Sequence, residues 1–101
     1  MPTTNTNSTT ASVKSLKLKQ GVILIGRADE NDLSVKDTQV NAYHAKIVTF
    51  FNASYVEDLG STHGTYLNGQ RVKKHTIHPG DVLKLGEQMF RVEQTETEAP
   101  S

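Results

Sequence analysis

Cysteine is absent from the 101-residue sequence. Without it the chain forms neither a disulfide framework nor a thiolate metal site, which indicates a reducing compartment and predicts a cytoplasmic protein. Long apolar runs are also absent: none approaches the roughly 20 residues of a membrane helix, so no membrane association is expected. The first ten residues have neither a basic start nor an apolar stretch, so a secretory signal is not predicted.

An excess of charge of one sign is missing as well, because 11 Lys and Arg balance 11 Asp and Glu. Attraction of the whole chain to nucleic acid is therefore not expected. Single-stranded nucleic acid would also need stacking aromatics, and the chain has no Trp. Three of the 11 acids follow Val92, which leaves 11 bases against 8 acids elsewhere. This mildly basic body is either ordinary surface charge or a surface that favours an anionic partner.

Polar composition at both ends predicts one folded unit over residues 12–94. Residues 1–11 are mostly Thr, Asn and Ser and have little to bury, so we expect a disordered arm. Residues 95–101 are expected to form an acidic, flexible tail. A chain of this length buries a single core, and we expect a monomer.

Apolar residues inside this unit alternate with period two, which indicates strands rather than helices. Between residues 44 and 51, for example, Ala45, Ile47 and Thr49 share one face. Asn68-Gly69 is a strong hairpin signal, and residues 78–81 form another tight turn. About nine short strands with this turn spacing are typical of an all-β sandwich or barrel. We expect them near residues 16–19, 22–25, 33–35, 44–51, 55–58, 66–67, 71–72, 82–85 and 89–92.

A series of short motifs resembles the forkhead-associated (FHA) domain over about three quarters of the chain. In order, these motifs are Gly26-Arg27, Asn31-Asp32-Leu33, Val40-Asn41-Ala42-Tyr43-His44-Ala45, Asp58-Leu59-Gly60-Ser61-Thr62-His63-Gly64-Thr65, Leu67-Asn68-Gly69, Gly80-Asp81 and Leu85-Gly86. Each is common alone, but their order and spacing together are specific. The resemblance implies a sandwich of two twisted, mainly antiparallel sheets. Its loops at one end would bind a phosphothreonine of a partner protein, as a non-catalytic module of phospho-signalling.

Arg27 is the first phosphopeptide-binding residue that the resemblance implies. A guanidinium at the mouth of a loop is suited to bidentate phosphate binding. The alternative is a surface arginine that pairs with a nearby carboxylate, namely Asp29, Glu30 or Asp32.

Asn41 stands where the FHA family usually has a serine that bonds the phosphate. An amide also donates hydrogen bonds, with longer reach, or Asn41 is only a loop residue that tolerates unusual dihedrals. Ala42 stands where a basic or amide side chain is common. Because a methyl group donates nothing, one contact is expected to be missing and the affinity to be weaker.

The loop of Ser61, Thr62 and His63 supplies the other implied phosphopeptide-binding residues. Thr62 offers a hydroxyl to the phosphate, and His63 replaces the asparagine that grips the peptide backbone in the family. A neutral imidazole still donates once and accepts once. A protonated one would add a cation and make binding sensitive to pH.

Loop-supporting roles are implied for five further residues: Gly26, His44, Gly64, Asn68 and Gly69. In the family, the histidine matched by His44 braces the loops and does not touch the ligand. Glycines permit backbone shapes that other residues avoid. The asparagine of the Asn68-Gly69 turn also ties neighbouring loops together in the family.

A basic run follows that turn at Arg71, Lys73 and Lys74. It is either a solvated strand edge or a surface for an acidic flank of the peptide.

Catalysis and metal binding are the more distant alternatives. Asp58, Ser61 and His63 suggest a triad, but they lie within six consecutive residues and nothing resembles a nucleophile elbow. His75 and His78 have no nearby third ligand, whereas zinc normally takes three or four. We therefore expect no catalytic residues, no metal and no cofactor.

Two alternatives concern binding itself. The phosphate pocket is degenerate if Asn41, Ala42 and His63 abolish its contacts, which would leave a phospho-independent interaction module. In the second alternative, the ligand is the chain's own arm or tail after phosphorylation. Its covalent link to the domain gives it a high effective concentration at the site. The candidate threonines of the arm and tail are Thr3, Thr4, Thr6, Thr9, Thr10, Thr95 and Thr97.

Overall fold

The computed structural model describes residues 12–94, which form ten strands. They are β1 (Val13–Lys17), β2 (Gly21–Gly26), β3 (Leu33–Ser34), β4 (Ala45–Phe50), β5 (Ala53–Asp58), β6 (Thr65–Leu67), β7 (Gln70–Val72), β8 (Lys74–Ile77), β9 (Val82–Leu85) and β10 (Gln88–Glu93). This part of the chain holds no helix long and apolar enough to cross a membrane. The predicted arm 1–11 and tail 95–101 lie outside the described residues.

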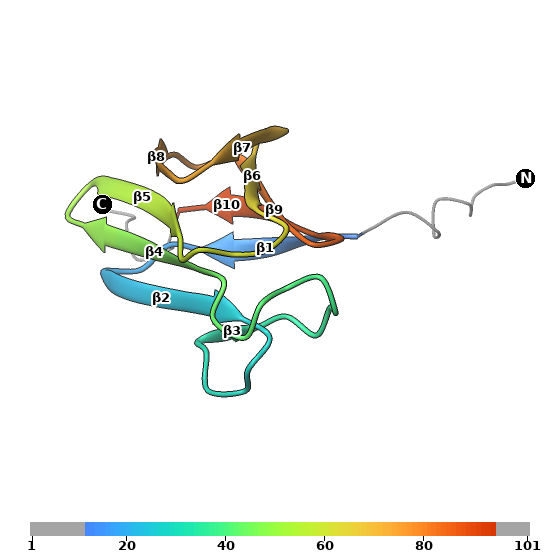
Figure 1. Ribbon diagram of the computed structural model, residues 1–101. Coiled ribbons are helices and arrows are strands. Elements are labelled where there is room, and N and C mark those ends of the chain that lie inside the picture. Colours follow the sequence, from blue (N-terminus) through green and yellow to red (C-terminus); the bar gives the residue numbers. More distant parts are fainter. Residues whose placement is uncertain (1–11, 95–101) are drawn as a thin grey trace, which may run out of the picture.

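The strands form two five-stranded sheets (Figure 1). Sheet A has the order β1-β10-β9-β6-β7, and sheet B has the order β3-β2-β4-β5-β8. Most neighbours are antiparallel, whereas β1 pairs with β10, and β2 with β3, in parallel. The predicted all-β sandwich of two mainly antiparallel sheets is confirmed.

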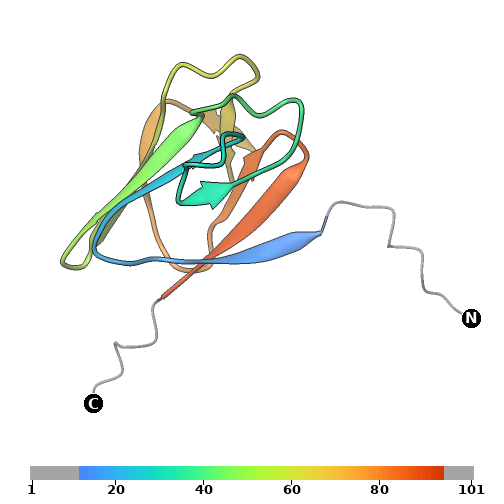
Figure 2. The same cartoon turned by 90° about the horizontal axis from the view of Figure 1, so that it is seen from below.

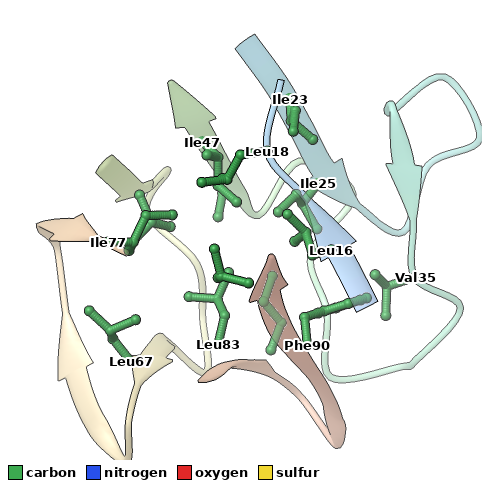
Figure 3. Close-up of a cluster of buried hydrophobic side chains, with 14 of the residues drawn as sticks. Leu16, Leu18, Ile23, Ile25, Val35, Ile47, Leu67, Ile77, Leu83 and Phe90 are labelled. Carbon is green, nitrogen blue, oxygen red and sulfur yellow. The ribbon is translucent and has the colours of Figure 1, made fainter. Parts of the chain in front are cut away.

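The hydrophobic core lies between the two sheets (Figure 3). Alternation along the strands builds it, because successive side chains point to opposite faces. In β4 the predicted face of Ala45, Ile47 and Thr49 is buried, while the residues between them are more exposed. Both sheets contribute fully buried side chains to the core. Ile25 and Val56 come from sheet B, and Leu83, Leu85 and Val92 come from sheet A.

The sequence pattern predicts nine strands, whereas the described residues form ten. One strand is not predicted. It is β8, at the edge of sheet B, where it pairs with β5. Only Ile77 of this strand is buried. An edge strand with one buried side chain has no alternation for the sequence to reveal.

Strand register places three long loops at one end of the sandwich. Ile25 pairs with Ala45, and Ala45 pairs with Asp58, so the end of β2, the start of β4 and the end of β5 lie at one edge. The segments that leave or enter there are 27–32, 35–44 and 59–64, which we call the loop cluster (Figure 2). At the other end of β6, Asn68 and Gly69 have positive φ angles of 50° and 85°, which confirms the hairpin turn.

Candidate functional site

Three segments of the loop cluster meet at Asn41. The Arg27 backbone N–H donates to the Asn41 carbonyl at 2.9 Å. The Asn41 side chain joins the third segment twice: its Oδ1 accepts from the Thr62 N–H at 3.0 Å, and its Nδ2 donates to Thr62 Oγ1 at 3.4 Å. Residues 14 and 21 positions apart in the sequence are thus held side by side.

These bonds determine which hydrogen-bond donors of the Asn41 and Thr62 side chains remain available. Because Thr62 Oγ1 accepts from Asn41, the hydroxyl proton of Thr62 is available to another acceptor. The second amide hydrogen of Asn41 is also available, and Thr62 is exposed. A serine hydroxyl at position 41 would be too short to bridge to Thr62 as the amide does.

The Arg27 side chain is exposed. It makes no hydrogen bond or ion pair within residues 12–94. The carboxylates proposed as its alternative partners are engaged elsewhere: Asp29 pairs with Lys36, and Asp32 Oδ2 accepts from the Leu24 N–H at 2.8 Å. The third carboxylate, of Glu30, accepts from the Tyr43 hydroxyl. The guanidinium therefore remains available to a ligand.

A close backbone approach holds the first two segments together. A Cβ on Gly26 would lie 2.2 Å from the Ala42 carbonyl oxygen, so only glycine fits there. The same oxygen accepts from the Ala28 N–H at 3.2 Å and from Asn31 Nδ2 at 2.7 Å. Asn31 is buried and was not recognised from the sequence as a loop-supporting residue. Its position in the motif was the available signal.

His44 lies beneath the cluster with no exposed surface. Its Nδ1 accepts the Asn41 N–H at 3.1 Å, so the ring proton is on Nε2. Nε2 then donates to the Gly64 carbonyl at 3.0 Å. The imidazole thus connects the segment of Asn41 to the segment of Thr62 from below.

Asp58 organises the third segment. From the sequence, the only chemical role suggested for this residue was in a catalytic triad. Its carboxylate accepts the Gly60 and Ser61 N–H groups at 3.0 and 2.9 Å, and the hydroxyls of Ser61 and Thr65 at 2.6 and 2.7 Å. Burial raises the pKa of Asp58, but these hydrogen bonds outweigh it and hold the pKa below its usual value. The signal for this role is an aspartate just before Gly and Ser, as in an Asx-turn.

The side chains of Ser61 and His63, both predicted to contact the ligand, point in different directions. The half-buried Ser61 hydroxyl donates to Asp58 and accepts from the Gly64 N–H at 2.9 Å, so it points into the loop. The structure thus groups its side chain with the loop-supporting residues. His63 is exposed, and no hydrogen bond of its ring occurs within the described chain.

The Asn68-Gly69 turn lies away from these residues. Asn68 Nδ2 donates to Asp81 Oδ1 at 3.1 Å, and Asn68 Oδ1 accepts from the Val82 N–H at 2.9 Å. The turn is thereby tied to the start of β9, at the end of β6 opposite Gly64. It supports the sandwich rather than the loop cluster directly.

The loop cluster offers an open surface rather than an enclosed cavity. A hollow of about 650 Å³ beside it is lined in part by Lys14, Val35, Lys36 and Phe90, but not by the Arg27, Asn41 or Thr62 side chains. No group of three His, Cys, Asp or Glu that could hold a metal is found between residues 12 and 94.

Comparison with known proteins decides the family. Residues 23–86 match the family profile of the FHA domain. The chain belongs to the FHA domain family.

Related FHA proteins support this assignment. FHA domain-containing protein FhaB of Mycobacterium tuberculosis is 42% identical over 72 residues, which are 70% of this chain and 46% of FhaB. The chain therefore spans less than half the length of this curated relative.

Solved FHA structures share the fold of this chain. One, from a structural and functional analysis of phosphothreonine-dependent FHA domain interactions, is 33% identical with a TM-score of 0.66, and covers 69% of this chain and 73% of its own. Mycobacterium tuberculosis EmbR, in complex with a low-affinity phosphopeptide, is 27% identical with a TM-score of 0.70, and covers 73% of this chain and 20% of its own.

Proposed function

We propose that this FHA domain binds phosphothreonine segments of partner proteins in phospho-signalling and has no catalytic activity. One observation carries the proposal: hydrogen bonds through Asn41 bring together the three residues that have donors available to a ligand. These donors are the exposed guanidinium of Arg27, the hydroxyl proton of Thr62 and the second amide hydrogen of Asn41.

A phosphate group matches these donors in chemistry. At pH 7 it carries a charge of about −1.5 to −2 and presents three strong acceptor oxygens. The guanidinium supplies a paired, charge-assisted contact, while Thr62 and Asn41 supply neutral donors for the remaining oxygen. The names of similar proteins, which include phosphothreonine-dependent and phosphopeptide-bound FHA domains, also support this ligand.

The non-catalytic part of the proposal is supported by the Ser61 hydroxyl. A serine nucleophile needs a general base within hydrogen-bonding reach. Ser61 donates to the Asp58 carboxylate, but the other hydrogen bonds to this carboxylate hold its pKa below the usual value and make it a poor base. Its neighbour His63 makes no bond to it among the residues that the structure describes. We also propose that the domain acts as a monomer in the cytoplasm, and the lack of cysteine in the sequence supports a reducing compartment.

The deciding experiment is a binding titration with a degenerate peptide library that has phosphothreonine at its centre, and with the same library left unphosphorylated. We expect only the phosphorylated library to bind, and Arg27→Ala to weaken binding at least about tenfold. Arg91→Ala is the matched control, because Arg91 is an exposed arginine of β10, away from the loop cluster. Equal binding of both libraries would instead establish a phospho-independent module.

The threonines of residues 1–11 and 95–101 are the remaining ligand candidates, and they lie outside the described residues. If they occupy the site, complete phosphorylation of the chain lowers its affinity for the external phosphopeptide library. Unchanged affinity would exclude them.

A further inference from the structure

Two cations and a tyrosine form a row across the outer face of sheet A. Tyr66 of β6 pairs with Arg71 of β7 on one side and with Lys84 of β9 on the other. Cross-strand partners point to the same face of a sheet. The neighbours of Tyr66 and Lys84 along their strands are buried, so this row faces outward. We call Arg71, Tyr66 and Lys84 the cationic row.

The cationic row reaches the loop cluster through Gly64. A Cβ on Gly64 would lie 2.6 Å from Arg71 Nε and 3.0 Å from Arg71 Cζ, so the guanidinium lies directly across this residue. Gly64 is two positions from Thr62, a span of at most about 7 Å. A second guanidinium is therefore built against the loop that carries the Thr62 hydroxyl.

The cations of this row are available to a ligand. Arg71 is exposed, and neither it nor Lys84 forms an ion pair within 4.0 Å anywhere in residues 12–94. Lys84 Nζ lies 6.0 Å from the centre of the Tyr66 ring. The charge of Asp37 interacts with Lys84, but the two side chains form no ion pair. The Asp37 carboxylate instead accepts hydrogen bonds from the backbone N–H groups of Gln39 and Glu87, at 2.8 and 2.9 Å.

The β2–β3 side of the loop cluster has more acids than bases, with three acids against Arg27 and Lys36. Asp29, Glu30 and Asp32 follow β2 within six residues of Gly26. A bound segment therefore meets acids on the side of the β2–β3 loop and cations on the side of sheet A. This asymmetry favours carboxylates over the cationic row and disfavours them on the other flank.

We propose that Arg71 and Lys84 form a second anion-binding subsite, which takes the carboxylates of acidic residues close to the phosphothreonine. The inference rests on the proposed function and adds the class of partner sequence: an acidic phosphothreonine segment. An extended chain advances about 3.3 Å per residue, so the acidic residues lie within about four positions of the phosphothreonine. Tyr66 keeps the two cations apart, so one carboxylate reaches each.

The expected contribution is modest because Arg71 is exposed and Lys84 is only half-buried. Pairs of this kind are individually weak and are screened by salt. We expect acidic flanks to tighten binding about fivefold at low salt, and this preference to disappear near 0.5 M salt, where the Debye length is about 4 Å.

The test uses the full chain and phosphothreonine peptide libraries that are degenerate at four positions on each side. Enrichment of Asp and Glu on one side is measured for the wild type and for Arg71→Gln/Lys84→Gln. The matched control, Lys17→Gln/Arg91→Gln, removes the same two charges from β1 and β10 of the same sheet. Thermal unfolding of each variant verifies its fold.

We expect the wild type and the control to select acidic flanks, and Arg71→Gln/Lys84→Gln to lose that selection. Phospho-dependent binding of the wild type without acidic enrichment would overturn the subsite alone, as would enrichment that survives in Arg71→Gln/Lys84→Gln. If the wild type binds no phosphopeptide, the proposed function itself fails, and the subsite fails with it.

Discussion

The inner and outer sides of the loop cluster are built in opposite ways. The inner layer consists of His44, Asp58, Ser61 and Thr65, whose polar atoms are bonded to one another or to loop backbone. His44 and the Asp58 side chain are 0% and 5% exposed. The rim, by contrast, consists of the exposed side chains of Arg27, Thr62 and His63.

This difference separates stability from binding. Buried polar groups that lose a partner carry a desolvation penalty, so changes in the inner layer should lower the free energy of unfolding. Exposed donors have water as a substitute partner, so changes in the rim should alter affinity and leave stability nearly unchanged. Asn41 belongs to both, because its backbone contacts His44 and its side chain contacts Thr62.

His44→Ala should have the largest effect. It leaves the Asn41 N–H and the Gly64 carbonyl without their partner and opens a cavity, which we expect to cost about 3 kcal/mol of unfolding free energy. Urea denaturation measures this loss. His75→Ala, on the exposed edge strand β8, is the control and should change stability by less than about 0.5 kcal/mol. A comparable loss in both variants would contradict the distinction between the layers.

Asp58→Asn should lower stability by about 2 kcal/mol at neutral pH, because one acceptor oxygen is replaced by a donor. The pKa of Asp58 is lowered in the fold. Its contribution is therefore complete above the unfolded value of about 3.9 and is lost as pH falls through the lower folded value. Denaturation midpoints from pH 7 to pH 2 should fall more steeply for the wild type than for Asp58→Asn. Glu57→Gln, which alters a carboxylate on the solvent side of β5, should retain the steep fall.

Thr62→Val tests whether a change in the rim alters affinity but not stability. It keeps the side-chain shape but removes the hydroxyl proton that we propose bonds the phosphate, which should weaken phosphopeptide binding by about 2 kcal/mol, or about thirtyfold. Calorimetric titration measures the affinity, and urea denaturation should show stability within about 0.5 kcal/mol of the wild type. A stability loss as large as that of His44→Ala would place Thr62 functionally in the inner layer.

His63→Asn should have the smallest effect. An asparagine amide donates and accepts hydrogen bonds as an imidazole does, and position 63 is exposed, so the phosphopeptide affinity of His63→Asn should stay within about threefold of the wild type at pH 7. Calorimetric titration measures the ratio of the two affinities. His78→Asn serves as the control. A loss as large as that of Thr62→Val would show that the imidazole makes a contact that the amide does not replace.

Much of the fold was predictable because its signals are local. Asn68-Gly69 predicts a hairpin because both residues need positive φ. The alternation of Ala45, Ile47 and Thr49 predicts which face of β4 is buried. Strand β8 was missed because it buries Ile77 alone, so its place at the sheet edge depends on pairing with β5, which is distant in sequence.

The candidate site was predictable as a set of residues but not as an arrangement. Motif order placed Arg27, Asn41 and Thr62 together, whereas the direction of each side chain follows from the folded loop. Ser61 points inward because Asp58 and Gly64 engage its hydroxyl. The two-residue Asn68-Gly69 turn sets the register that pairs Tyr66 with Arg71, but the placement of the Arg71 side chain across Gly64 depends on the folded loop.

The parallel pairing of the first and last strands has a mechanical consequence. Val13 to Lys17 run beside Met89 to Glu93 in the same direction (Figure 1). Tension between the amino end of β1 and the carboxyl end of β10 acts along the strands, so their evenly spaced hydrogen bonds share the load and must rupture together. The domain is thus arranged to resist stretching when it is held by its two ends within a longer polypeptide.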